Sequence, residues 1–127
     1  MRKVSGFTLI ELVAVIAILA ILAVTALPKF FDLRQDAANA SVTGIGGSLS
    51  SASTINYAKR LTTTAGFSSI TACAATDANL LLPGGLPTGY TISGAAGIAN
   101  GAAGTCVLTA VVSGVTATAT FVIFGAS

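Results

Sequence analysis

The feature that most constrains this chain is a run of 17 positions without a charged side chain, from Leu12 to Pro28. Counted from Phe7 to Leu27, the apolar stretch has 21 residues and contains a single acid, Glu11. As a helix it measures about 32 Å at ~1.5 Å per residue, which matches a bilayer core of roughly 30 Å. The stretch therefore predicts one membrane-spanning segment rather than the core helix of an ordinary soluble domain.

The charges around this segment indicate its orientation and leave one alternative open. Arg2 and Lys3 precede it, whereas acids accompany the cations that follow, so the charge bias places the amino end in the cytoplasm. The alternative is an ordinary secretory signal peptide with small residues at positions 24–26 as its cleavage site. The apolar run exceeds the ~7 to 15 residues usual in such a peptide. A carboxylate inside it also costs about 2.5–3.5 kcal/mol on insertion scales, so Glu11 is expected to have a partner.

The composition argues against catalysis and against nucleic-acid binding. Only 8% of the residues are charged, and the chain has four acidic residues and no His for metal binding or proton transfer. A net charge of +2 is too small for a nucleic-acid footprint. We therefore expect no enzyme activity, no catalytic residue, no cofactor, no metal site and no nucleic-acid partner. Asp32 and Asp36, four residues apart, are interpreted as part of a solvated helix face rather than as a divalent-ion site.

A short basic leader is joined to the apolar run by the residues Gly6-Phe7-Thr8-Leu9-Ile10-Glu11. This sequence resembles the processing signal of the type IV pilin and pseudopilin superfamily. That signal combines a small residue, an apolar first mature residue and an acid as the fifth mature residue, directly before a long apolar helix. The resemblance covers Met1 to about Arg60. It implies that a membrane prepilin peptidase cuts after Gly6 and N-methylates the new amino terminus, Phe7.

The same resemblance assigns roles in assembly to Glu11 and Pro28. Glu11 matches the acid whose partner is the amino terminus of a neighbouring subunit, and a nearby ammonium group would stabilise a carboxylate that an apolar bundle otherwise disfavours. The alternative is a carboxyl group that stays neutral in the bilayer. Pro28 matches the proline that follows the first apolar segment, and it predicts a kink or an unwound turn near residues 24–28. Alternatively, Pro28 begins a new helix at its first turn.

The resemblance also implies a function for the whole chain. A major pilin is a structural subunit that a single span anchors in the inner membrane before assembly into an extracellular filament. Its implied partners are other copies of itself, the prepilin peptidase, and the assembly platform with its ATPase motor. The run from Pro28 to Ala37 is similar to the mannose-sensitive haemagglutinin subgroup of these pilins. The alternatives are a pseudopilin of a type II secretion system and, from another class, a small secreted binding module.

The expected fold is α+β, with a long spine helix over about residues 7–60 whose amino-terminal half is hydrophobic. Residues 61–88 are rich in Thr, Ala, Ser and Gly and are expected to form an irregular loop region. The second half of the helix carries apolar residues three and four positions apart. These residues are Val42, Ile45, Leu49, Ala52 and Ile55. Gly44, Gly46 and Gly47 mark a soft spot in this half or a point of close backbone approach by a neighbour.

Strand patterns dominate the carboxyl-terminal part of the chain. Strands are expected at residues 90–93, 105–112 and 115–124, and the last two are joined by the two-residue turn Ser113-Gly114. We therefore expect a small antiparallel sheet against which the spine helix packs. The expected domains are a leader at 1–6, a membrane and filament-core segment at 7–28, and a head at 29–127.

Cys73 and Cys106 are the only cysteines, and both lie in the part expected outside the cell, where disulfides form and persist. A bridge between them would close a loop of about 34 residues and stabilise the head by about 3–4 kcal/mol. The alternative is two buried free thiols. A disulfide also resembles the family, but pilins commonly place their second cysteine nearer the chain end. Their disulfide-bounded surface loop is therefore not transferred to this chain.

Overall fold

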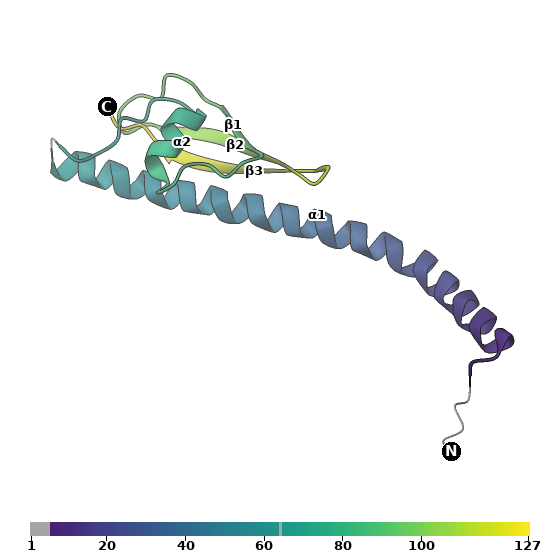
Figure 1. Ribbon diagram of the computed structural model, residues 1–127. Helices are drawn as coiled ribbons and strands as arrows, with labels where there is room; N and C mark the ends of the chain where they lie inside the picture. Colours follow the sequence, from purple (N-terminus) through teal and green to yellow (C-terminus); the bar gives the residue numbers. More distant parts are fainter. Residues whose placement is uncertain (1–5, 64) are drawn as a thin grey trace, which may run out of the picture. The chain divides into compact units, whose positions relative to one another are not determined.

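The computed structural model describes residues 6–63 and 65–127. Residues 1–5, which make up most of the expected leader, lie outside the described residues. The elements follow in the order α1 (Leu9–Thr62), α2 (Ala75–Leu81), β1 (Tyr90–Gly94), β2 (Ala103–Val112) and β3 (Val115–Phe124) (Figure 1). They form two compact units, one that ends at Arg34 and one from Gln35 to Ser127. The predicted α+β class is thus confirmed.

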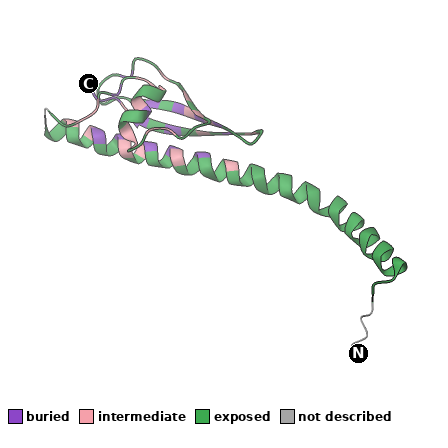
Figure 2. Ribbon diagram, viewed as in Figure 1, coloured by how far each residue is buried: buried purple, intermediate pink, exposed green. Residues whose placement is uncertain are grey.

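The first unit contains α1 up to Arg34, and its residues from Gly6 to Arg34 are all exposed (Figure 2). The large apolar side chains between Leu9 and Leu27 have exposed fractions of 48% to 81%. Within the described residues, α1 is the one helix that is long enough and apolar enough to cross a membrane. Such a helix buries its surface only in lipid or against other chains. This agrees with the predicted membrane anchor.

Pro28 lies inside α1, and the helix continues through residues 24–28. The unwound turn expected there is therefore not found, and the alternative that Pro28 starts a new helix is wrong. Because proline has no N–H, the carbonyl of Val24 loses its helical donor. The hydroxyl of Thr25 donates to the carbonyl of Leu22 at 2.9 Å, a type of bond that also tends to bend helices. Bending of α1 is therefore easiest near this proline.

The second unit contains a three-stranded antiparallel sheet in the order β1-β2-β3. β1 pairs with β2 from Tyr90 to Gly94, and β2 pairs with β3 along the whole length of both strands. Both residues of the predicted turn have positive φ, 51° at Ser113 and 78° at Gly114. This backbone matches the right-handed twist of the flanking strands. The three predicted strands are confirmed, with shifts of one or two residues at their ends.

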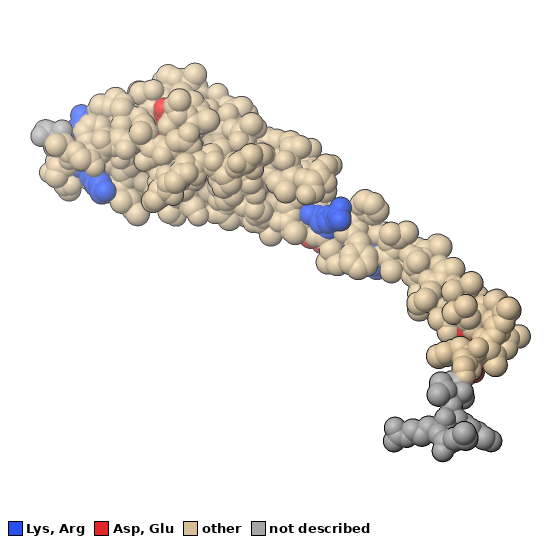
Figure 3. All heavy atoms as spheres, in the orientation of Figure 1, with Lys and Arg blue, Asp and Glu red and all other residues tan. Residues whose placement is uncertain are grey.

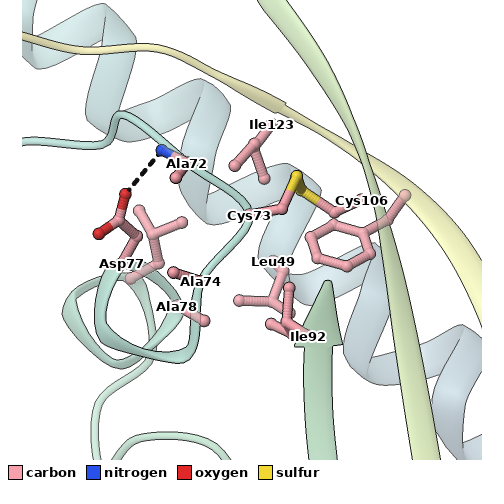
Figure 4. A pocket seen from close by; sticks show the side chains of 11 residues that line it. Leu49, Ala72, Cys73, Ala74, Asp77, Ala78, Ile92, Cys106 and Ile123 are labelled. Atoms are coloured by element: carbon pink, nitrogen blue, oxygen red, sulfur yellow. Dashed lines mark hydrogen bonds between the residues drawn. A yellow bond between two sulfur atoms is a disulfide. The ribbon is translucent and has the colours of Figure 1, made fainter. Parts of the chain in front are cut away.

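α2 lies inside the region expected to be an irregular loop, so that prediction is wrong there. Its N-cap is Ala74, whose side chain makes no capping hydrogen bond, so the capping residue that usually marks a helix start is absent from the sequence here. Tertiary contacts hold the helix instead. It packs beside β1, and Ala78 is 4% exposed. The Asp77 carboxylate accepts bonds from the backbone N–H groups of Thr71 and Ala72 at 2.8 and 3.0 Å, and Figure 4 shows the bond from Ala72.

The core of the second unit lies between the sheet and the part of α1 that follows Gln35. Its largest fully buried side chains are Leu49, Ile70, Leu108, Val42, Cys106 and Ser53. The residues of α1 that face inward are Val42, Gly46, Leu49, Ser53 and Asn56. The predicted apolar stripe is correct at Val42 and Leu49 but wrong at Ile55, which is 59% exposed.

Two polar side chains explain this rotation of the buried face. The Ser53 hydroxyl oxygen accepts a bond from the N–H of Phe124 at 2.7 Å. The Asn56 side chain donates to the carbonyl of Ser68 and accepts from its N–H, both at 2.7 Å. An unpaired buried backbone group costs about 1–3 kcal/mol, so these bonds outweigh the burial of one more apolar side chain. The helix therefore turns Ser53 and Asn56 inward and leaves Ile55 outside.

Cys73 and Cys106 form a disulfide across 33 positions of sequence. The predicted bridge is confirmed, and the alternative of two free thiols is wrong. The bond joins the segment before α2 to the central strand of the sheet, and the two residues are 7% and 0% exposed. Apolar side chains of Leu49, Ile92 and Ile123 surround it (Figure 4).

Two adjacent glycines of α1 provide a matched test of the helix–sheet packing. A Cβ added at Gly46 would lie 3.4 Å from the Cβ of Phe121, whereas one added at Gly47 would meet no atom within 4 Å. Both Gly46→Leu and Gly47→Leu gain helix propensity, but only the former overpacks the core. We expect the free energy of unfolding of Gly46→Leu to be about 1–3 kcal/mol below that of Gly47→Leu. Thermal unfolding of the full chains in detergent micelles measures this difference, and equal stabilities would contradict the packing.

Candidate processing and assembly site

The predicted cleavage point lies in exposed backbone directly before α1. Gly6, Phe7 and Thr8 have no helix or strand assignment, and the Phe7 side chain is 89% exposed. A Cβ added at Gly6 would meet no atom within 4 Å. Packing among the described residues therefore does not require glycine at this position. The substrate pocket of a protease can impose a requirement for a small residue at such a position.

Thr8 and Glu11 form a reciprocal cap at the start of α1. The backbone N–H and the hydroxyl of Thr8 both donate to Glu11 Oε2, at 2.8 and 2.7 Å. In return, the backbone N–H of Glu11 donates to the hydroxyl oxygen of Thr8 at 3.4 Å. This is a capping box, in which a threonine before the helix and a glutamate three positions later satisfy N–H groups that otherwise lack partners.

Glu11 is predicted to have a partner from its cost in a membrane and from the family resemblance, whereas Thr8 is not among the predicted site residues. The signal was present, because Thr-x-x-Glu directly before an apolar run is the pattern of a capping box. The Thr8–Glu11 pair thus stabilises the helix start within one chain, in addition to any contact that Glu11 makes with another chain. It fixes the first turn of α1 immediately after the predicted cleavage point.

The capping box leaves part of the Glu11 carboxylate available to a partner. Both Thr8 donors reach Oε2, and within the part of the chain that the structure describes no donor reaches Oε1. The carboxylate also lies in the first turn of α1, where the helix macrodipole favours a negative charge. The chain itself therefore stabilises this charge while one oxygen stays accessible to a cation.

The remaining predicted site residues do not join this cluster. Pro28 lies 17 positions after Glu11 on α1, about 25 Å away at ~1.5 Å per residue. Cys73 and Cys106 belong to the second unit. Among residues 6–63 and 65–127, no group of three or more His, Cys, Asp or Glu side chains lies close enough to hold a metal ion. The chemistry of this site is therefore that of a cleavable peptide bond followed by a capped, charged helix start.

The amino-terminal segment carries a motif known from other proteins. Residues 1–27 match the prokaryotic N-terminal methylation motif. The matched residues include the predicted leader, the predicted cleavage point, Glu11 and the apolar stretch up to Leu27, and the match supports a type IV pilin or pseudopilin precursor. It implies processing by a prepilin peptidase and assembly by type IV pilus machinery, and together with the apolar helix it supports membrane anchoring before assembly. Comparisons with curated proteins and with solved structures gave no match.

Proposed function

We propose that this chain is the major structural subunit of a type IV pilus. The observation that carries this proposal is the methylation motif over residues 1–27, whose helical part from Leu9 onward exposes its large apolar side chains. Lipid would cover that surface before assembly, and identical helices would cover it in the filament. In this proposal residues 7–28 form the filament core and residues 29–127 the head.

The charge distribution supports close packing of copies. Removal of Arg2 and Lys3 with the leader leaves four basic and four acidic side chains. Figure 3 shows that few charged side chains interrupt the visible surface. Subunits without net charge do not repel one another strongly when packed side by side. The disulfide and the acid-poor head favour a pilin over a pseudopilin, and the likeness of residues 28–37 to the mannose-sensitive haemagglutinin subgroup stays a prediction.

Three steps of the proposed pathway take place at this site. Hydrolysis of the Gly6–Phe7 peptide bond releases the leader with a new carboxylate and leaves an ammonium group on Phe7. Transfer of a methyl group from a sulfonium donor then replaces one N–H proton of that amine, with release of the proton and of the donor as a thioether, and the amine keeps its positive charge. In the filament, this cation would approach the Glu11 carboxylate of a neighbouring copy, where Oε1 is accessible.

Mass spectrometry of the mature amino terminus tests the processing step. We expect the mature chain to begin with N-methylated Phe7, whereas a start near Leu27 would show an ordinary signal peptide. Gly6→Leu should accumulate as the uncleaved precursor, because the described residues leave space for the larger side chain and only the peptidase pocket opposes it. Gly47→Leu, which also adds a side chain in open space, should be cleaved normally.

Electron microscopy of sheared surface material distinguishes the major pilin from the pseudopilin. Filaments composed mainly of this chain are expected for a major pilin. A chain that is N-methylated but stays in the membrane fraction under the same conditions would favour the pseudopilin.

A further inference from the structure

We propose that residues 27–34 of α1 carry a two-sided contact between copies, in which an aromatic face ending in Arg34 packs against the Asp32 side of the next copy. This inference rests on the proposed function and deepens it by naming the surfaces that meet. All the residues that it uses belong to the first unit.

The first of the two surfaces is the aromatic face. Leu27, Phe30, Phe31 and Arg34 line one shallow pocket. They lie three, four and seven positions apart, which is the spacing of anchors on a single helix face that docks against a partner. Leu27, Phe30 and Phe31 are 58%, 64% and 66% exposed, so a partner can reach them. Buried aromatic side chains and arginine are also the residues that most often dominate binding between proteins.

The second surface lies on the other side of the same helix. At about 100° per residue, Asp32 is turned by roughly 150° from the centre of the aromatic face. Asp32 and Lys29 are both exposed and share this side, with Lys29 three positions earlier. A guanidinium group that reaches this surface is attracted by Asp32 and repelled by Lys29. The two charges therefore fix where along the helix a neighbour's Arg34 can lie.

The placement of complementary surfaces on opposite sides determines the kind of assembly. A symmetric dimer uses the same face on both copies, whereas two different faces make a heterologous contact. Each added copy then offers a free surface to the next one, so growth continues into a ring or an open helical filament. The contact thus accounts for polymerisation at the point where α1 leaves its membrane-length apolar segment.

Charge reversal on both sides tests the contact in cells that produce the full chain. Arg34→Asp and Asp32→Arg each place like charges across it, and we expect at least about tenfold less filament from either variant. The double variant Arg34→Asp/Asp32→Arg restores an opposite-charge pair and should recover filaments to within about twofold of the original chain. Lys59→Asp reverses an exposed cation outside the contact and should leave filament yield unchanged. Immunoblots should show normal leader cleavage in all four variants.

Cross-linking provides a readout that does not depend on filament yield. Cells that produce Arg34→Cys and Asp32→Cys chains together should form a disulfide-linked dimer on oxidation, and cells with either chain alone should not. Equal cross-linking of Arg34→Cys with itself would overturn the heterologous contact, as would a double charge variant as defective as the single ones. Failure of the unmodified, N-methylated chain to form filaments would instead overturn the proposed function.

Discussion

Replacing Glu11 with glutamine should abolish or sharply reduce surface filaments while membrane insertion and leader cleavage stay intact. Glutamine can still accept the two bonds from Thr8, because glutamate and glutamine serve equally in a capping box. It lacks the negative charge that the proposed pairing with the Phe7 amine of a neighbour requires. Removing one partner of a buried ion pair leaves the other charge unpaired, which costs about 3–5 kcal/mol per contact. Immunoblots of membrane fractions and electron microscopy of sheared material measure the two outcomes.

Two further variants separate the charge of Glu11 from its role in the cap. Glu11→Leu removes both the negative charge and the side-chain hydrogen bonds of the cap, and it should abolish filaments as Glu11→Gln does. Thr8→Val removes the hydroxyl but keeps the carboxylate and its bond from the backbone N–H, and we expect a cost of about 0.5–2 kcal/mol in helix stability with filaments retained. Normal filaments from Glu11→Gln together with loss of filaments from Thr8→Val would show that the cap, rather than the charge, supports assembly.

Replacing both cysteines with alanine should lower the free energy of unfolding of the head by about 3–4 kcal/mol. The bond ties the segment before α2 to the central strand across 33 positions, and its loss gives the unfolded chain a much larger set of conformations. For a domain of this size, each kcal/mol moves the melting temperature by about 4–8 °C, so we expect a fall of at least about 12 °C. Circular dichroism of the full chain in detergent micelles measures this transition.

The reduced form of the unmodified chain is the control for this pair of substitutions. It loses the bond but keeps both sulfur atoms, so it separates the effect of the bond from that of smaller side chains in a buried place. We expect the reduced chain to melt close to the Cys73→Ala/Cys106→Ala variant. If the oxidised and reduced chains melt at the same temperature, the disulfide does not stabilise the head.

Sequence reasoning succeeds where the relevant interactions are local. The membrane-length helix follows from consecutive apolar residues, and the hairpin follows from alternation around Ser113-Gly114. It failed at α2, a helix of seven residues without a side-chain cap. Isolated helices of that length are unstable in water, so contacts from elsewhere in the chain have to hold α2 in place.

The sequence alone determines the membrane-length helix and its capping box. The hydropathy of 21 consecutive residues and the three-residue step from Thr8 to Glu11 require no partner from elsewhere in the chain. Only the tertiary structure decided which side of the second half of α1 is buried. Ser53 and Asn56 face inward because they pair with backbone groups that lie 71 and 12 positions further along the chain. Backbone groups on an edge strand and in a loop need these hydrogen-bond partners, and this need determines which side of the helix is buried. The periodicity of the helix sequence gives no information about it.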